Sequence, residues 1–161
     1  MSDTGLRLAC DAMCSGLARW LRAIGCDTFY HDGIADQELI DVALAQRRVV
    51  ITSDGKLLER RLFTTGRLRA VALPRGLKRL DQVEYVARAL HLTVRDARCT
   101  RCNGQLVPVS RDEVGDRVPA RSLIWARKFF LCDDCRHVFW DGTHWQRISA
   151  VRNRIAEITS T

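Results

Sequence analysis

The chain has 161 residues, of which 47% are hydrophobic and 28% charged, and its formal net charge is +7. This size allows one sizeable core and a small second module, so we expect one larger and one smaller domain. The sequence contains no run of about 18 uncharged apolar residues, and Met1–Gly5 lacks the layout of a signal peptide. These features argue against a membrane-spanning or secreted protein, and we expect a cytoplasmic one.

Signals for strands and helices alternate from Leu6 to about Leu92. The expected strands are Leu6–Cys10, Asp27–Tyr30, Val49–Thr52 and one near Leu68–Leu73. The expected helices are one that ends near Gly25, and then about Asp36–Gln46, Asp54–Leu62 and Leu80–Leu90. Val49–Thr52 is apolar without polar alternation, as expected for a strand that is covered on both faces. The alternation predicts an α/β domain, a parallel sheet with helices on both faces and right-handed crossovers.

Aspartates follow two of the expected strands, Asp11 after the first and Asp54 after Val49–Thr52. Ligands of open α/β sheets bind beyond the carboxyl ends of the strands, so the two carboxylates should face one crevice. Asp36 and Glu38, at the start of the intervening helix, can add a third ligand for Mg²⁺ or Mn²⁺. Each aspartate taken alone is also explained as a residue that caps or opens a helix.

The positive charge is concentrated in the segment from Lys56 to Arg79. This segment holds eight basic residues and one acid, Glu59, and so accounts for the whole net charge. A surface that neutralises phosphates is one interpretation, with Lys56, Arg60 and Arg61 among its cations. A solvated surface with no partner is the other, and the sequence does not decide between them.

Near Thr93 cysteine pairs replace the helical periodicity. Two C-x-x-C knuckles are present, Cys99–Cys102 and Cys132–Cys135, separated by 29 residues that a hairpin insertion would accommodate. Thiolates at this spacing approach one ion from a single turn, and two such turns supply the tetrahedral ligand set that zinc prefers. We therefore predict a structural zinc site on Cys99, Cys102, Cys132 and Cys135, in preference to a redox motif. His137 is a possible substitute ligand, although a surface or hydrogen-bonded histidine fits better beside four thiolates.

The other cysteines, Cys10, Cys14 and Cys26, lack this spacing and are interpreted as small buried hydrophobic residues, with accessibility an open question for Cys14. The C-terminal third is rich in aromatic residues, which either pack around a small zinc core or form a stacking platform for single-stranded RNA. These residues are Trp125, Phe129, Phe130, Phe139, Trp140 and Trp145.

Several segments together resemble the Mut7-C RNase family, whose members have a PIN-like nuclease domain followed by a zinc ribbon. The opening match consists of Leu8–Met13, Leu17–Arg22 and Gly25–Thr28. Further matches are Asp36–Leu39, Ile51–Asp54, the four knuckle cysteines, Arg117–Pro119 and Gly142–Trp145. The departures, at Cys14–Gly16 and Ser53, flank the acids without removing them.

The resemblance implies metal-dependent hydrolysis of RNA phosphodiester bonds. Carried over by motif, Asp11, Asp36 and Asp54 are ligands of Mg²⁺ or Mn²⁺, and Glu38 is a replacement or an outer partner. Asp81, just before the last helix of the first domain, is a weaker fourth acid.

Arg19 and Arg22 are three residues apart on the first expected helix, and therefore on one face of it. Phosphate binding by this pair is one hypothesis, and a solvated helix face is the other.

The resulting prediction is a PIN-like nuclease domain in residues 1–93, a zinc ribbon in 94–147 and a C-terminal tail in 148–161. The expected function is a metal-dependent ribonuclease with RNA as its partner, zinc as a structural ion and Mg²⁺ or Mn²⁺ as the catalytic ion. The alternative is a catalytically silent RNA-binding or scaffold protein. The choice of RNA, endo- or exonucleolytic cleavage, the number of catalytic metals, the oligomeric state and any inhibitor stay open.

Overall fold

The structure is a computed structural model that describes residues 5–160. The expectation about a signal peptide concerns Met1–Gly5, of which the first four lie outside the described residues. Within 5–160, no helix has the length and apolar character needed to cross a membrane.

The first half of the chain forms the predicted parallel sheet, and its strands follow the order β2-β1-β3-β4. The strands are β1 (Arg7–Cys10), β2 (Asp27–Phe29), β3 (Val49–Thr52) and β4 (Ala70–Ala72). Every pair in this sheet is parallel, with Cys10 opposite Ile51 between the two central strands. The carboxyl ends of β1 and β3 therefore meet at one edge, and this alignment brings the residues after them together.

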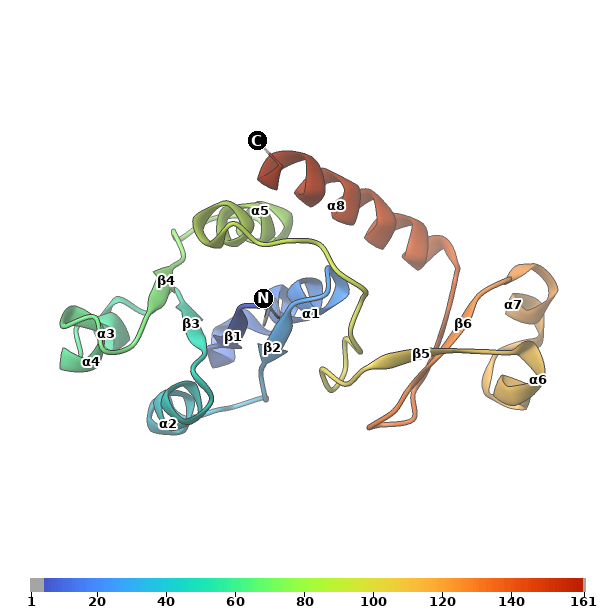
Figure 1. The fold of residues 1–161 in the computed structure, drawn as a ribbon, viewed down its shortest axis with the longest axis horizontal. Coiled ribbons are helices and arrows are strands. Elements are labelled where there is room, and N and C mark those ends of the chain that lie inside the picture. The colour runs from blue at the N-terminus through green and yellow to red at the C-terminus, as the bar shows by residue number, and fades with distance from the viewer. Residues whose placement is uncertain (1–4, 161) are drawn as a thin grey trace.

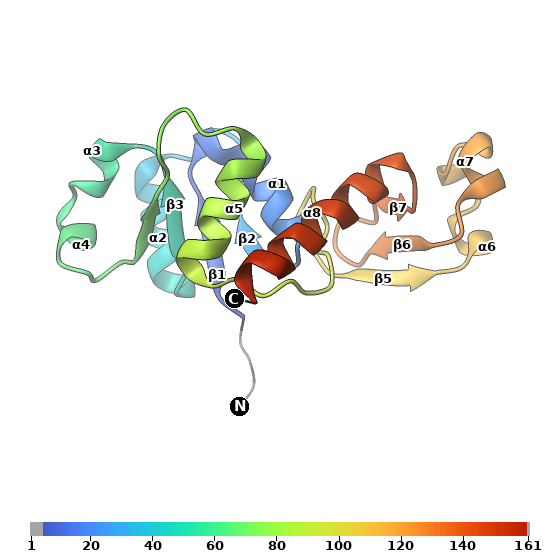
Figure 2. The same ribbon diagram turned by 90° about the horizontal axis from the view of Figure 1, so that it is seen from above.

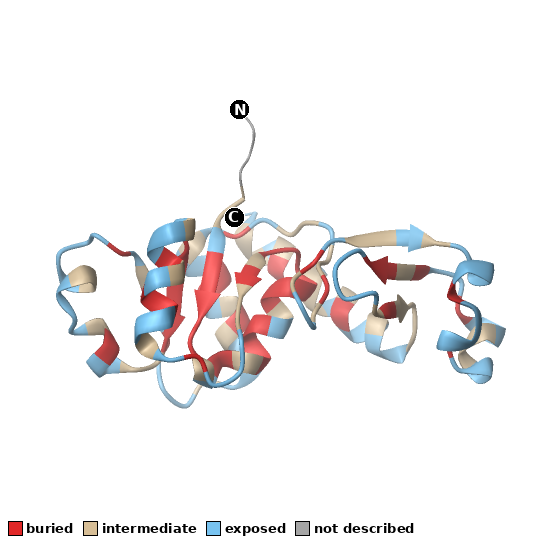
Figure 3. Ribbon diagram, turned by 90° about the horizontal axis from the view of Figure 1, so that it is seen from below, coloured by how far each residue is buried: buried red, intermediate tan, exposed pale blue. Residues whose placement is uncertain are grey.

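Helices cover both faces of this sheet, as predicted (Figure 1). Helices α1 (Ser15–Ala23) and α5 (Arg79–Leu90) lie on one face, and α2 (Asp36–Gln46) lies on the other. Side chains alternate along β1, so Leu8 packs toward α1 and α5 while Ala9 packs toward α2. Figure 3 shows the buried residues gathered along the sheet and on the sides of the helices that face it.

The region after β3 differs from the single helix expected at Asp54–Leu62. It forms two short helices, α3 (Gly55–Leu58) and α4 (Arg61–Thr64). Arg60 between them has an extended backbone, with ψ of 141°, which interrupts the helical hydrogen-bond ladder.

The cysteine-rich part forms an antiparallel sheet in the order β5-β6-β7. Its strands are β5 (Leu106–Val109), β6 (Phe129–Cys132) and β7 (Val138–Trp140). Between β5 and β6 the chain forms α6 (Arg111–Val114), the short turn η2 (Gly115–Arg117) and α7 (Ala120–Trp125), so the insertion is helical and not a plain hairpin. Val114 and Val118 from this insertion pack with Phe129 and Val138 in a separate small core.

The last helix, α8 (Thr143–Thr159), returns over the first domain and crosses α1 and α5 (Figure 2). Ile155 of α8 is fully buried in the same core as α1 and α5. Arg152 Nη1 donates a 2.8 Å hydrogen bond to the carbonyl of Ala23. Of the segment expected to be a C-terminal tail, 148–161, residues 148–159 thus belong to the packed helix α8, and Thr161 lies outside the described residues.

Candidate functional site

Asp11 and Asp54 lie at the neighbouring carboxyl ends of β1 and β3. The buried hydroxyl of Thr52 joins them, because Thr52 Oγ1 donates a 2.6 Å hydrogen bond to Asp11 Oδ2 and accepts one of 2.9 Å from the backbone N–H of Asp54. Asp11 is only 6% exposed, and its own N–H donates to the carbonyl of Ile51. Its side chain makes no capping bond to the turn η1 (Ala12–Cys14) that follows, so helix capping does not explain this aspartate.

Asp54 combines this position with a capping role. Its Oδ1 accepts hydrogen bonds from the backbone N–H groups of Lys56 and Leu57, at 2.9 and 3.4 Å. The N-terminal N–H groups of a helix attract a carboxylate, so this contact holds the side chain of Asp54 in one orientation. The second oxygen, Oδ2, has no hydrogen-bond partner among residues 5–160 and can serve as a ligand.

The two acids of α2 each have a cationic or titratable partner. Asp36 Oδ2 lies 3.3 Å from Arg60 Nη2, and Glu38 Oε1 lies 3.1 Å from His31 Nε2. The hydrogen bond to the Asp32 carbonyl, and then the hydrogen bond and charge of Glu38, raise the pKa of the exposed His31. These contacts occupy one oxygen of each carboxylate with a neighbouring side chain.

The four acids do not converge as a complete ligand set. Within the described part of the chain, one group of three or more histidine, cysteine or acidic side chains could hold an ion together, and it is the cysteine cluster. The sheet edge therefore brings Asp11 and Asp54 together through Thr52, while Asp36 is paired with Arg60.

The thiols beside Asp11 are protonated and inaccessible. Burial, and then the negative charge of Asp11, raises the pKa of Cys14 to about 11. Cys10, Cys14 and Cys26 are all buried, as expected for small hydrophobic residues. Cys14 is therefore not the accessible thiol that the sequence left open.

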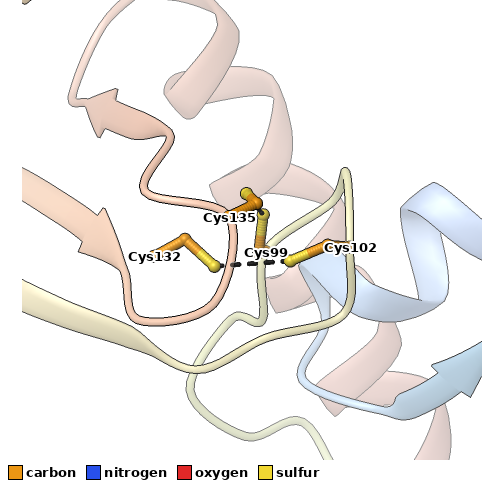
Figure 4. Close-up of side chains that lie close together, drawn as sticks. All are labelled: Cys99, Cys102, Cys132 and Cys135. Atoms are coloured by element: carbon orange, nitrogen blue, oxygen red, sulfur yellow. Dashed lines mark hydrogen bonds between the residues drawn. The ribbon is translucent and has the colours of Figure 1, made fainter.

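The four knuckle cysteines meet at one point between the two turns (Figure 4). Their sulfur atoms all lie within 4.8 Å of one another, with Cys99 Sγ 3.6 Å from Cys135 Sγ and Cys102 Sγ 3.4 Å from Cys132 Sγ. Tetrahedral thiolates at 2.3 Å from zinc are about 3.8 Å apart, so the cluster nearly has the size of a zinc site. This arrangement indicates zinc binding at the predicted ligands.

The turn around the first knuckle is shaped for this cluster. Asn103 has a left-handed backbone, with φ of 73°, and a Cβ added to Gly104 would lie 2.8 Å from Cys132 Sγ. No side chain fits there without moving the sulfur, so glycine allows the two turns to close. His137 is not a ligand, because its Nδ1 lies 2.9 Å from Arg101 Nη1, outside the thiol cluster.

Arg22 corrects one prediction, because it is not available for phosphate. Its side chain is buried, with 3% of the residue exposed. The guanidinium donates to four backbone carbonyls at 2.9–3.3 Å, those of Thr28, Tyr30, Thr100 and Arg101. Neither the phosphate hypothesis nor the solvated helix face applies, since Arg22 ties α1 to the first cysteine knuckle. Burial lowers the pKa of Arg22, but a guanidinium stays charged at neutral pH.

The remaining candidates for RNA contact are exposed. Arg19, Lys56, Arg60 and Arg61 all reach solvent, although Arg60 also pairs with Asp36. Asp81 is exposed in the first turn of α5.

Sequence reasoning missed the role of Thr52 and placed Arg79 only within the basic segment. The signal for Thr52 was its place as the last residue of an apolar strand between two acids, and its hydroxyl is what joins them. No sequence signal showed that Arg79 lies on α1, where a Cβ added to Gly16 would lie 2.1 Å from the Arg79 guanidinium carbon. The guanidinium thus rests directly on the backbone of α1.

Comparison with known proteins agrees with the geometry at the level of family. The family described as the Mut7-C RNAse domain matches residues 6–152. A human protein named exonuclease mut-7 homolog is 32% identical over 125 residues, which cover 74% of this chain and 14% of that relative. The chain thus corresponds to a small part of the relative's length. No solved structure matches it.

Proposed function

The chain belongs to the Mut7-C RNAse domain family, and we propose that it is a metal-dependent ribonuclease that hydrolyses RNA phosphodiester bonds at the Asp11–Asp54 edge of the parallel sheet. The family and the exonuclease relative support a nuclease. The observation that carries the proposal is the Thr52 hydroxyl, which holds Asp11 and the backbone of Asp54 together where two strands end.

The donors at this edge suit a hard divalent cation. Mg²⁺ and Mn²⁺ prefer oxygen ligands, and Mg²⁺ is commonly held by one or two carboxylates while waters and substrate phosphates complete its shell. Asp11 and Asp54 each keep one carboxylate oxygen without a hydrogen-bond partner in the described chain, so two ligands are available without rearrangement. A bound ion would supply an activated water and stabilise the negative charge of the transition state.

The other residues of the edge have supporting roles in this proposal. Asp36 is held by Arg60 and becomes a third ligand if that arginine turns to a substrate phosphate. Glu38 lies two residues after Asp36 in the first turn of α2, pairs with His31, and is an outer partner in this proposal. Lys56 and Arg61 are exposed beside Arg60, where they would contact the RNA backbone.

The zinc ribbon has a structural role in this proposal. A cluster of four thiolates leaves no open ligand position, so the ion would fold the knuckles without taking part in hydrolysis. Hydrogen bonds from Arg22 to Thr100 and Arg101 fix the folded knuckle against the nuclease domain. In this proposal the ribbon also helps to hold the RNA.

A cleavage assay tests the proposal. Purified protein is mixed with end-labelled single-stranded and structured RNA, with Mg²⁺, with Mn²⁺ and with neither. Cleavage should require the ion and should fall by orders of magnitude in Asp11→Asn. The matched control is Asp41→Asn, which alters an exposed carboxylate of α2 away from the edge and should leave cleavage unchanged.

One observation favours the second candidate, an RNA-binding or scaffold protein without activity. The acids do not converge as a complete ligand set within residues 5–160, and Asp36 is paired with Arg60. Tight RNA binding with no cleavage under any of these metal conditions would select this candidate.

A further inference from the structure

A groove lined by cations lies between the two domains. It has a volume of about 500 Å³ and is bounded by α1, the start of α5, the first cysteine knuckle and α8. Its lining residues include Arg19, Arg79, Arg101, His137 and His144. No aspartate or glutamate lines the groove, so it carries three arginine charges without a neighbouring carboxylate.

The arginines of this groove differ from others in the protein. Arg48, Arg60 and Arg154 each pair with an acidic side chain. Within 5–160, Arg19 and Arg79 have neither an ion pair nor a side-chain hydrogen bond, and the Arg79 guanidinium rests on the backbone of Gly16. Arg101 is held in place by the contact between its Nη1 and His137 Nδ1. Exposed guanidinium groups without acidic partners on three different elements form a site suited to phosphate oxygens.

An aromatic hollow of about 450 Å³ continues from this groove, and His137 and His144 line both. The rings of Trp125, Phe139 and Trp140 contribute to its wall. Trp125 is 51% exposed, which is unusual for so large an apolar side chain. A Cβ added to Gly142 would lie 3.0 Å from the Trp125 ring, so glycine lets the ring lie against the backbone before α8.

We propose that the groove and the aromatic hollow bind one single-stranded segment of RNA, with phosphates on Arg19, Arg79 and Arg101 and a base stacked at Trp125. Unpaired bases stack on aromatic rings whatever their identity, and a basic groove follows the backbone beside them. A duplex cannot offer its bases to the ring, because they are already stacked and paired.

The groove also leads to the catalytic edge. Gly16 lies in the first turn of α1, five residues after Asp11, while Ala23 at the other end of α1 lies next to the ribbon. At 1.5 Å per residue this helix path is about 10 Å long. An RNA strand bound in the groove would extend along α1 toward Asp11. Only this part of the proposal rests on the proposed function.

Fluorescence anisotropy with a labelled single-stranded RNA, in buffer without added Mg²⁺ or Mn²⁺, measures binding separately from cleavage. The log-log dependence of affinity on salt should flatten by about 1.4 in Arg19→Ala/Arg79→Ala, since each single-strand phosphate contact contributes about 0.7. The control variant, Arg127→Ala/Lys128→Ala, removes the same charge from exposed ribbon residues outside the groove and should keep the wild-type slope.

The stacking half is tested at Trp125. Trp125→Leu should weaken binding by roughly 5- to 150-fold, as for loss of one base–aromatic stack, while Trp125→Phe, which keeps a ring, should lose much less. Circular dichroism and zinc content of each variant establish that it is folded. A duplex of the same sequence should bind more weakly than the single strand.

The binding and cleavage results distinguish the groove proposal from the proposed nuclease function. An unchanged salt slope in Arg19→Ala/Arg79→Ala, or equal affinity for Trp125→Leu and wild type, overturns the groove even if the protein cleaves RNA. The groove proposal is also overturned if RNA affinity falls only in Lys56→Ala/Arg61→Ala, a result that would assign the phosphate contacts to the basic segment. Groove-dependent binding without any cleavage supports the groove and overturns the nuclease.

Discussion

Replacing Arg22 by methionine tests whether this arginine holds the ribbon against the nuclease domain. Methionine fills a similar volume but leaves the carbonyls of Thr28, Tyr30, Thr100 and Arg101 without their donor. A hydrogen bond from a charged donor contributes about 1.5–3 kcal/mol net. The four do not add fully because three of the contacts are only partly buried, so we expect a loss of about 3–5 kcal/mol in the free energy of unfolding.

Thermal unfolding followed by far-UV circular dichroism, with zinc present, measures this loss. For a domain of this size 1 kcal/mol lowers Tm by about 2–4 °C, so Arg22→Met should unfold about 6–20 °C below wild type. Arg19→Met, on the exposed side of the same helix, should change Tm little. Arg22→Lys keeps the charge but cannot reach four carbonyls from one nitrogen, and it should lie between the two. A loss below about 1 kcal/mol in Arg22→Met would refute the assigned role.

Three further predictions concern zinc, pH and the catalytic edge. Purified protein should contain about one equivalent of zinc, and Cys102→Ser should disorder β5–β7 while the parallel sheet stays folded; elemental analysis that finds no zinc would contradict this. Burial raises the pKa of Asp27, but hydrogen bonds from Arg48 and Asn103 outweigh it, so the folded pKa lies below its ordinary value. The stability contributed by this carboxylate is therefore present above the unfolded pKa of about 3.9 and lost as the pH falls through the folded value. In urea titrations the difference between wild type and Asp27→Asn should shrink below about pH 4, and a constant difference would show that the charge is unimportant. Thr52→Val should leave the fold intact and reduce cleavage by about 10- to 100-fold, because Asp11 loses its 2.6 Å hydrogen bond; wild-type rates would remove Thr52 from the account.

The parts of the fold that depend on local pattern were predictable. The β-branched run Val49–Thr52 identified a doubly covered strand, and its four residues are all buried. The spacing of the cysteine pairs predicted the cluster of four thiols, because two residues between thiols fix the turn geometry without help from the rest of the fold.

The parts that depend on distant partners were not predictable. Arg22 looked like a surface cation because its acceptors at Thr100 and Arg101 are 78 and 79 residues away. The helical insertion, in contrast, has a local signal in the sequence, the capping box from Ser110 to Glu113. The packing of α8 against the first domain also has a local sequence signal, because Ile148, Val151 and Ile155 recur at helical spacing.

In the candidate site at the sheet edge, too, some features follow from local sequence pattern and others from distant contacts. The sequence placed Asp11 and Asp54 at strand ends, and the parallel register then made them neighbours. It could not show that Asp36 pairs with Arg60, because that contact depends on the break between α3 and α4. The groove between the domains arises only when α8 folds back over α1.

The rate of RNA cleavage by the Asp54→Asn variant tests most directly the central claim, that Asp54 holds a catalytic metal ion. Asparagine caps a helix about as well as aspartate, so if Asp54 only caps α3, the variant should keep its stability and its activity. If Asp54 holds Mg²⁺ or Mn²⁺, the substitution removes a charge that the ion needs, and cleavage of labelled RNA should fall by orders of magnitude while the fold and RNA binding persist. We predict the second result, and a folded Asp54→Asn protein that cleaves RNA at close to the wild-type rate would contradict the account.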